Sequence, residues 1–284
     1  VWSETPVRGP DAFAQKLPTP PSAPGSFGSL RGLSRDAGLK PARADSVYYA
    51  DSAVVAFPTP PDETLMDELR PSASTAGGRL DPGPLMDDVL STGATIAAGA
   101  DGSAWVQYEF SQPVRVKAVT LSAPGRGVPF GEIGVSGDGT IFRAVAQLPG
   151  AMQYRPGGIK TYAFPETTAR FVRVTITGAA PDPDAVIYQM APQPAKQYRL
   201  DEFIVHTGAR VDRWQDKAGF NLIYEYHVAP TPPVAAASLI PAENVVDLTS
   251  KMQPDGTLRW DVPPGRWTIL RMGYSLVGSR NRAG

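Results

Sequence analysis

Cysteine is absent from the 284 residues of the chain, and histidine occurs only twice, as His206 and His227. Without cysteine the chain has no disulfide framework, no thiol catalysis and no thiolate metal site. Two histidines far apart in sequence exclude a multi-histidine metal site and leave little material for histidine-based catalysis.

An excess of charge of one sign is also missing, because 27 lysines and arginines face 28 aspartates and glutamates. With no basic surplus to neutralise phosphates, we do not expect a dedicated nucleic-acid binder. The chain has no run of about 18 apolar residues, so we expect no membrane span. What it has in abundance is 28 glycines and 30 prolines, which exclude long helices, while 42% hydrophobic residues are enough for a real core.

Short alternating stretches predict β-strands through most of the chain. In residues 105–110, Val106, Tyr108 and Phe110 share one face. In residues 170–177, Val172, Val174 and Ile176 share a face, which places Arg173 on the opposite, non-core face. Further strand candidates are 47–49, 53–57, 114–121, 133–135, 141–148, 161–164, 200–206 and 222–228. Short strands separated by turns predict a mainly β protein built as an antiparallel β-sandwich.

The sequence divides into four segments. Residues 1–45 are rich in proline and glycine and predict an extended, irregular arm, and residues 46–209 hold the predicted sandwich. A short helix is expected within 62–69, with Asp62 as its cap. Residues 210–278 predict an additional β region, with strands at 245–248, 258–262 and 267–276 and turns at 255–256 and 263–265. Residues 279–284 form the last segment.

Two sets of motifs resemble known families. Between Asp87 and Gly208 the chain reads WVQYEF, QPVRVKAVTL, IGVSGDGTIFRAVA, TYAFPETTARFVRVTITG and LDEFIVHTG, in that order. This order resembles the discoidin or galactose-binding-like jelly rolls of many carbohydrate-binding modules. The stretch VVDLTSKMQPDGTLRWDVPPGRWTILRMGYSLVGSRN at 245–281 resembles glycoside hydrolase family 106, the large α-L-rhamnosidases. VWSETP at 1–6, YYADSAVVAFPTP at 48–60 and DKAGF at 216–220 resemble the same family.

The second resemblance implies a place within a longer enzyme. Family members are several times longer and carry inverting catalytic carboxylates on a (β/α)8 barrel, which would begin again at residues 279–284. The implied partners are that barrel and a rhamnose-containing oligosaccharide or glycoside. No motif in the chain matches the catalytic carboxylates, so we expect the chain alone to hydrolyse nothing. A periplasmic or secreted location is favoured, although no signal peptide is visible.

A calcium site is the one cofactor that the resemblance to galactose-binding-like modules implies. Glu202 stands in LDEF, where such modules often carry a calcium-binding glutamate, and Asp87 and Asp88 lie where the partner loop would start. Hard oxygen ligands suit Ca²⁺. The alternative is that all three are ordinary acids of loops and strand ends.

Six residues are candidates for contact with sugar. Trp105 offers an aromatic face for a sugar ring, or packs at the rim of the sandwich. Tyr154, Arg155 and Tyr188 lie in predicted loops, which often carry binding residues. Glu4 and Asn281 border the points where the chain would meet the barrel and could contact substrate there. The histidines are expected to be exposed or hydrogen-bonded structural residues.

Three functions follow from these observations. The chain is a non-catalytic scaffold of an α-L-rhamnosidase that walls part of the substrate cleft, an autonomous carbohydrate-binding module, or a discoidin-like adhesion domain. Titration with rhamnose, galactose and rhamnogalacturonan oligomers separates the first two, because only an autonomous module would bind sugar saturably. The third requires a protein partner that no motif identifies.

Overall fold

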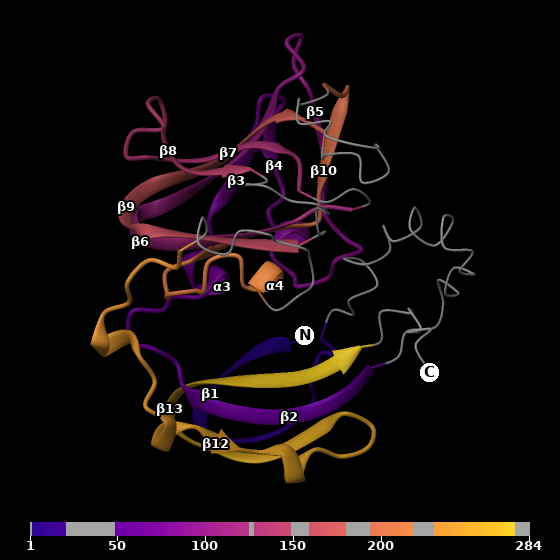
Figure 1. Ribbon diagram of the computed structural model, residues 1–284, viewed down its shortest axis with the longest axis vertical. Helices are drawn as coiled ribbons and strands as arrows, with labels where there is room; N and C mark the ends of the chain where they lie inside the picture. The colour runs from indigo at the N-terminus through magenta and orange to yellow at the C-terminus, as the bar shows by residue number, and fades with distance from the viewer. Residues whose placement is uncertain are drawn as a thin grey trace, which may run out of the picture. The chain divides into compact units, whose positions relative to one another are not determined.

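The computed structural model describes residues 2–20, 49–124, 128–148, 159–179, 194–217 and 230–275. These residues form two compact units (Figure 1). One, the terminal unit, combines residues from 1–24, 33–61 and 235–284, and the other, the sandwich unit, is built mainly from 62–234. Both ends of the sequence therefore contribute to the terminal unit. None of the helices in the described ranges is long and apolar enough to cross a membrane.

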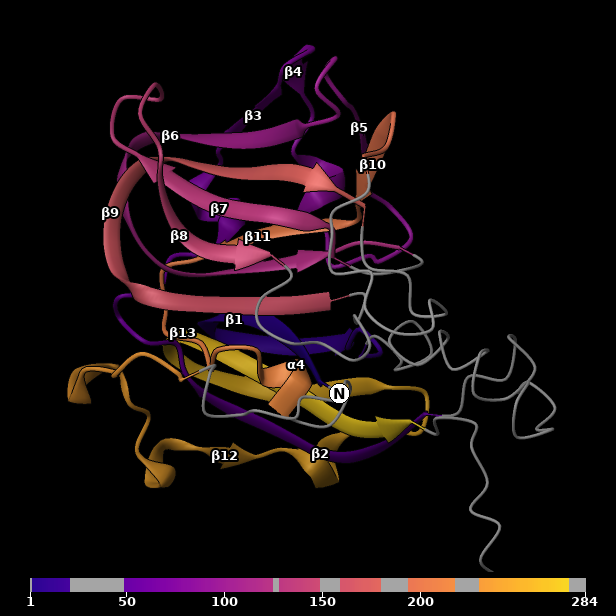
Figure 2. The ribbon, with the colours of Figure 1, turned by 45° about the horizontal axis from the view of Figure 1, so that its top comes forward.

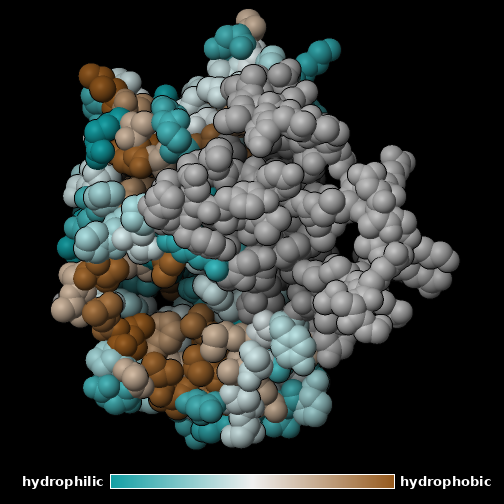
Figure 3. Space-filling view, viewed as in Figure 1, coloured by the Kyte–Doolittle hydropathy of each residue, from teal (hydrophilic) through white to brown (hydrophobic). Residues whose placement is uncertain are grey.

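The terminal unit is a four-stranded antiparallel sheet with the order β1-β13-β2-β12. Its strands are β1 (Trp2–Lys16), β2 (Tyr49–Pro58), β12 (Val246–Asp247) and β13 (Thr257–Ser275). Single 3-10 turns lie at η4 (Ala236–Ser238), η5 (Ala242–Asn244) and η6 (Thr249–Lys251). One face buries Leu17, Val54, Ala56, Leu248, Leu258, Trp260, Val262 and Ile269. In the space-filling view, apolar residues drawn in brown are also visible on the surface in the lower part of the picture, where the terminal unit lies (Figure 3).

Strand β1 corrects the expectation of an irregular arm over residues 1–45. Residues 2–16 pair with β13 in a register that runs from Trp2 opposite Met272 to Lys16 opposite Thr257. The arm was expected from the prolines at 18, 20, 21 and 24, which all follow the end of β1. Within β1, an edge strand tolerates Pro6 and Pro10 because one row of its backbone groups needs no partner in the sheet. The remaining part of the expected arm, residues 21–45, lies outside the described residues.

Strand β13 corrects the expectation of two strands joined by a turn at 263–265. It continues through Pro263 and Gly265, with a register shift against β1 between Gly9 and Asp11. A bulge absorbs the residue that breaks the pairing, so the prolines bend the strand without ending it. Gly9 permits this approach, because a Cβ there would lie 2.0 Å from the carbonyl oxygen of Pro263. The expected turn at Asp255–Gly256 is present and leads into β13.

The sandwich unit confirms the predicted antiparallel fold. Its main sheet has the order β4-β3-β6-β9-β7-β8, with β11 also pairing with β6, and β5 and β10 form a separate pair. The strands are β3 (Ser72–Thr75), β4 (Gly78–Leu80), β5 (Ala94–Ala97), β6 (Ala104–Ser122), β7 (Phe130–Ser136), β8 (Arg143–Leu148), β9 (Ile159–Gly178), β10 (Gln197–Leu200) and β11 (Glu202–His206). The helices are short: α3 (Met66–Leu69), η2 (Gly83–Leu85) and α4 (Trp214–Lys217).

Strands β6 and β9 are each one long, bent strand where the sequence predicted two. Their pairing shifts register between Glu109 and Val114 and again between Val116 and Ala118. Figure 2 shows β9 curving from one layer of the sandwich into the other. Across the core between these layers, the ring of Tyr108 stacks on that of Phe203 at 4.3 Å. The predicted core face of 105–110 is therefore confirmed.

Two boundaries differ from the expected segments. Strand β2 was expected in the sandwich of residues 46–209, but it pairs with β12 and β13 in the terminal unit. The reason is long-range pairing, which a strand's own sequence does not specify. Helix α3 lies within the expected 62–69, but its N-cap is Leu65 and not Asp62, whose carboxylate pairs with Lys117 instead.

Candidate functional site

The acidic loop of the sandwich unit, residues 87–93, precedes β5. The Asp87 carboxylate accepts hydrogen bonds from the backbone N–H of Val89 at 3.0 Å and from the Thr92 hydroxyl at 2.9 Å. Asp88 has a positive φ of 57°. Gly93 has a φ of 136°, and a Cβ there would lie 2.3 Å from the carbonyl oxygen of Leu200. The glycine therefore lets this loop approach the strand pair that leads to Glu202.

Glu202 is the buried acid of this region. Only 2% of the residue is exposed, and neither carboxylate oxygen accepts a hydrogen bond of normal geometry from the residues that the structure describes. Burial, together with the negative charges of Asp88 and Asp87, raises the pKa of Glu202 to about 8. The Tyr108 hydroxyl is buried without a partner as well, and burial and Glu202 raise the pKa of that phenol.

The negative charges of these acids repel one another, whereas a bound cation would stabilise them. An uncompensated buried carboxylate is costly, and a bound cation would supply the missing charge. Carboxylate and hydroxyl oxygens are the ligands that Ca²⁺ takes at flexible geometry. Within the described ranges, however, no three acidic or histidine side chains lie close enough together to form a metal cluster. Calcium therefore remains a prediction, and Glu202, Asp88 and Asp87 are the residues that would hold it.

A second site lies on the outer face of the sandwich unit, where Trp105 projects from β6. The guanidinium group of Arg173 lies 4.5 Å from the Trp105 ring centroid and 3.8 Å from that of Phe142. Its Nε and Nη2 atoms donate hydrogen bonds of 3.0 and 2.6 Å to the side-chain oxygen of Gln107. Burial lowers the pKa of Arg173. We call Trp105, Gln107, Phe142 and Arg173 the stacked patch.

The stacked patch was only partly foreseen. The alternation of β9 placed Arg173 on the outer face, and the parity of β6 placed Trp105 there, and both placements are confirmed. Their contact depends on the register that sets Gln107 opposite Arg173 and Arg173 opposite Gly134, which only the folded sheet reveals. Phe142 was missed as a site residue, because it was assigned to a strand candidate at 141–148, whereas β8 begins only at Arg143 and Phe142 lies just before it.

Of the other expected sugar contacts, the described residues include only Glu4. Glu4 lies in β1, exposed, and accepts a hydrogen bond from the Trp2 indole N–H at 3.2 Å. Tyr154, Arg155, Tyr188 and Asn281 lie outside the described residues.

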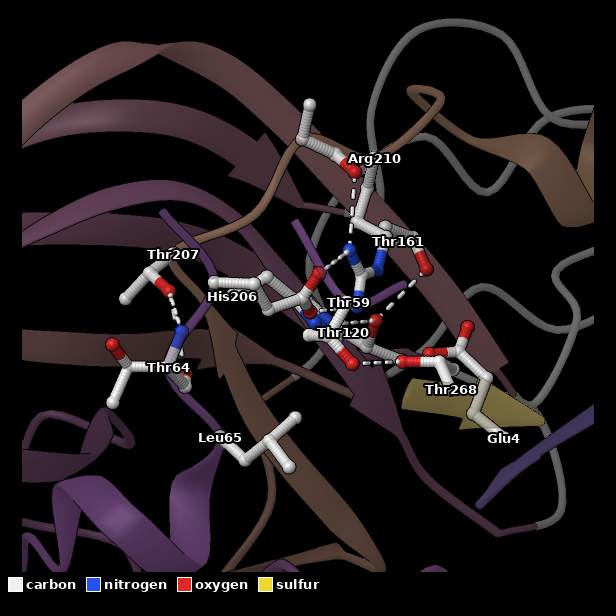
Figure 4. A network of polar contacts seen from close by, with 12 residues as sticks. Glu4, Thr59, Thr64, Leu65, Thr120, Thr161, His206, Thr207, Arg210 and Thr268 are labelled. Atoms are coloured by element: carbon white, nitrogen blue, oxygen red, sulfur yellow. Dashed lines mark hydrogen bonds and ion pairs between the residues drawn. The ribbon is translucent and has the colours of Figure 1, made fainter. Parts of the chain in front are cut away.

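His206 is held in a hydrogen-bond network of the sandwich unit, as its structural interpretation predicted (Figure 4). Its Nε2 atom lies 2.7 Å from the Thr120 hydroxyl, which lies 2.8 Å from the hydroxyl of Thr161. The side-chain amide of Gln215 donates to Thr161 at 2.9 Å. Burial and the nearby charge of Arg210 lower the pKa of His206 well below its usual value. His227 lies outside the described residues.

Comparison with known proteins now decides the family. A model of the alpha-L-rhamnosidases, glycoside hydrolase family 106, matches residues 1–284. The chain belongs to glycoside hydrolase family 106. A solved structure of the same type, a rhamnosidase from Novosphingobium sp. PP1Y, is 27% identical, with a TM-score of 0.68 over 97% of this chain. This family 106 chain spans 23% of that rhamnosidase's length.

Two further similarities are partial. A putative beta-glucuronidase from Formosa agariphila is 34% identical over 56 residues, which is 19% of this chain and 5% of the relative. A CBM32 module of Clostridium perfringens matches 48% of this chain and 91% of its own length, with 13% identity and a TM-score of 0.35.

Proposed function

We propose that this family 106 chain is the non-catalytic β portion of an α-L-rhamnosidase, which scaffolds the catalytic barrel and walls part of its substrate cleft. The observation that carries the proposal is the family match over all 284 residues of a chain that forms β-sheet units. The substrate of the whole enzyme would be a glycoside or polysaccharide with terminal α-L-rhamnose.

Five acidic side chains support a structural role, because each is engaged in an ion pair or in hydrogen bonds within a turn. Glu63 pairs with Arg210, Glu109 with Arg170 and Asp51 with Arg271. Asp101 and Asp138 accept hydrogen bonds within their own turns, which lower the pKa of both carboxyls. A carboxyl whose pKa is lowered, as in Asp101 and Asp138, is a poor general acid, since that role requires a raised pKa.

The proposal is tested with the purified 284-residue chain and a chromogenic α-L-rhamnoside. We expect no turnover, and no saturable heat on titration with rhamnose or galactose. Turnover that a single Asp or Glu substitution within the chain abolishes would overturn the non-catalytic role.

We further propose that the acidic loop and Glu202 bind a structural Ca²⁺. What supports this is the pair of buried Glu202 oxygens that lack hydrogen-bond partners beside Asp88 and Asp87. When bound, the ion would supply positive charge to three carboxylates and fix the loop against β11. Direct titration of the chelator-treated chain with CaCl₂ tests this proposal, and an absence of binding would contradict it.

A further inference from the structure

The stacked patch has hydrogen-bond donors that the protein does not use. Arg173 gives its Nε and Nη2 atoms to Gln107, so among the described residues its Nη1 atom has no acceptor. The amide nitrogen of Gln107 has none either, since only its oxygen is engaged. Neither nitrogen is among the buried atoms that lack a partner, so both reach solvent. The patch therefore presents donors toward an acceptor outside the protein.

Arg173 and Gln107 belong to a row of residues that lie opposite one another on neighbouring strands, which we call the rung. The rung continues toward the edge of the sheet. Across the strands, Arg173 lies opposite Gln107, Gln107 opposite Ser74, and Ser74 opposite Arg79. Arg79 is exposed, and its side chain makes no ion pair or hydrogen bond in the described structure. Three strand spacings of about 4.8 Å place the two arginines about 14 Å apart along the sheet. The rung thus presents one cation at each end with small or amide side chains between.

The charge around the rung favours an anionic ligand. On the neighbouring rung, Arg170 is already paired with Glu109 at 2.7 Å. Glu132, diagonal to Arg173, accepts a hydrogen bond of 3.4 Å from the Gln147 side-chain amide and is an acid of the same face that no arginine pairs with in the described structure. The two positive charges of Arg79 and Arg173 exceed the single negative charge of Glu132. The planar fork of an arginine held between two rings is preorganised for a carboxylate.

We infer that the stacked patch and Arg79 form a binding site for a saccharide that carries carboxylate groups, with the carboxylate on Arg173 and a sugar ring against Trp105. The inference rests on the proposed function only in taking a polysaccharide as the ligand, and it goes beyond it, because a non-catalytic portion can also hold the polymer. Trp105 supplies an apolar surface for a ring, and Gln107 supplies donors for hydroxyl oxygens.

The experiment is isothermal titration of the 284-residue chain with oligogalacturonate and with the same oligomer as its methyl ester. We expect saturable binding of the acid that weakens with salt, and binding of the neutral ester at least about tenfold weaker. Arg173→Gln should weaken binding about tenfold or more, and Arg79→Gln should weaken it a few-fold. Arg115→Gln removes the same charge from an exposed arginine outside the patch and should leave binding unchanged.

Two controls keep the test decisive. If Arg173→Gln does not fold, as judged by near-ultraviolet circular dichroism, Arg79→Gln and Arg173→Lys decide, since lysine keeps the charge and loses the fork. A ligand-induced fluorescence change should also disappear in Trp105→Phe. Absence of binding to the acid, equal binding of the ester, or equal effects of Arg79→Gln and Arg115→Gln would overturn the inference. None of these outcomes bears on turnover of a rhamnoside, so the two proposals fail separately.

Discussion

Arg271 in the terminal unit and Glu202 in the sandwich unit are both charged residues with little exposure, 7% and 2% respectively, but their surroundings differ. Arg271 donates to Asp51 through Nε at 2.7 Å and Nη2 at 3.0 Å, and through Nη1 to the carbonyl oxygen of Leu17 at 2.9 Å. Among the described residues, neither Glu202 oxygen accepts a hydrogen bond of normal geometry, and the charges of Asp88, Asp87 and Asp201 lie nearby. The protein itself thus satisfies the charge of Arg271, whereas Glu202 has a raised pKa and would need a cation from outside the protein to stay ionised near neutral pH.

The largest effect is expected when the satisfied charge is removed. Arg271→Met leaves the Asp51 carboxylate and the Leu17 carbonyl without their donor, and we expect a loss of about 3 kcal/mol in the free energy of unfolding, since breaking a buried pair costs about 3–5 kcal/mol. The low end applies because Asp51 is one-third exposed. Urea unfolding followed by tryptophan fluorescence measures the loss. Arg259→Met, at an exposed position of the same strand, is the control. An equal loss in both variants would contradict a stabilising role for the contacts of Arg271 with Asp51 and Leu17.

The unsatisfied charge should give a smaller and conditional effect. Calcium at about 100 times its dissociation constant should stabilise the chain by about 2.7 kcal/mol, because the ion binds the folded state alone. Glu202→Gln should abolish this gain, and thermal unfolding with and without CaCl₂ measures it. Glu132→Gln removes another glutamate of the same unit and should retain the full response. A calcium response that survives in Glu202→Gln would remove Glu202 from the site.

How far sequence reasoning reached differs between the two units. In the sandwich unit, alternation in residues 105–110 and 170–177 predicted the core faces correctly, because side chains of period two reveal which face is buried. In the terminal unit, β1 was missed, because Pro6, Gly9 and Pro10 obscure any alternation in an edge strand. Strand β13 was divided at Pro263 for a similar reason, since a bulge and a turn carry the same residues.

The candidate sites also differ in how much of each could be predicted from the sequence. Glu202, Asp87 and Asp88 were predicted from a family resemblance, and the structure adds the buried, unpaired state of Glu202. The contact of Arg173 with Phe142 could not be predicted, because it depends on strand register and on the path of a turn. Gly134 makes room for it, since a Cβ there would lie 3.3 Å from the Phe142 Cβ.

The hydrogen-bond network of His206 gives a third comparison, because the buried group there is neutral and not charged. Its folded pKa lies below the unfolded value of about 6.5, so the unfolded chain binds more protons as the pH falls through that value. The network therefore contributes stability above about pH 6.5 that is lost on acidification. Melting temperatures at pH 7.5 and 5.5 should diverge more for the parent chain than for His206→Gln. His227→Gln is the matched control, and an unchanged difference in His206→Gln would contradict the burial of the ring.

The smallest effect is expected for an ion pair that water reaches. Arg170 and Glu109 lie 2.7 Å apart, but their side chains are 45% and 40% exposed. Water screens the pair and the side chains lose freedom in forming it, so Arg170→Gln should cost at most about 1 kcal/mol. A double-mutant cycle with Glu109→Gln isolates the coupling, and added salt should reduce it further. A coupling near the loss expected for Arg271→Met would show that exposure does not separate these arginines. In that case the hydrogen bonds that each arginine donates, to Asp51 and Leu17 from Arg271 and to Glu109 and Phe110 from Arg170, would have to explain the strength of both.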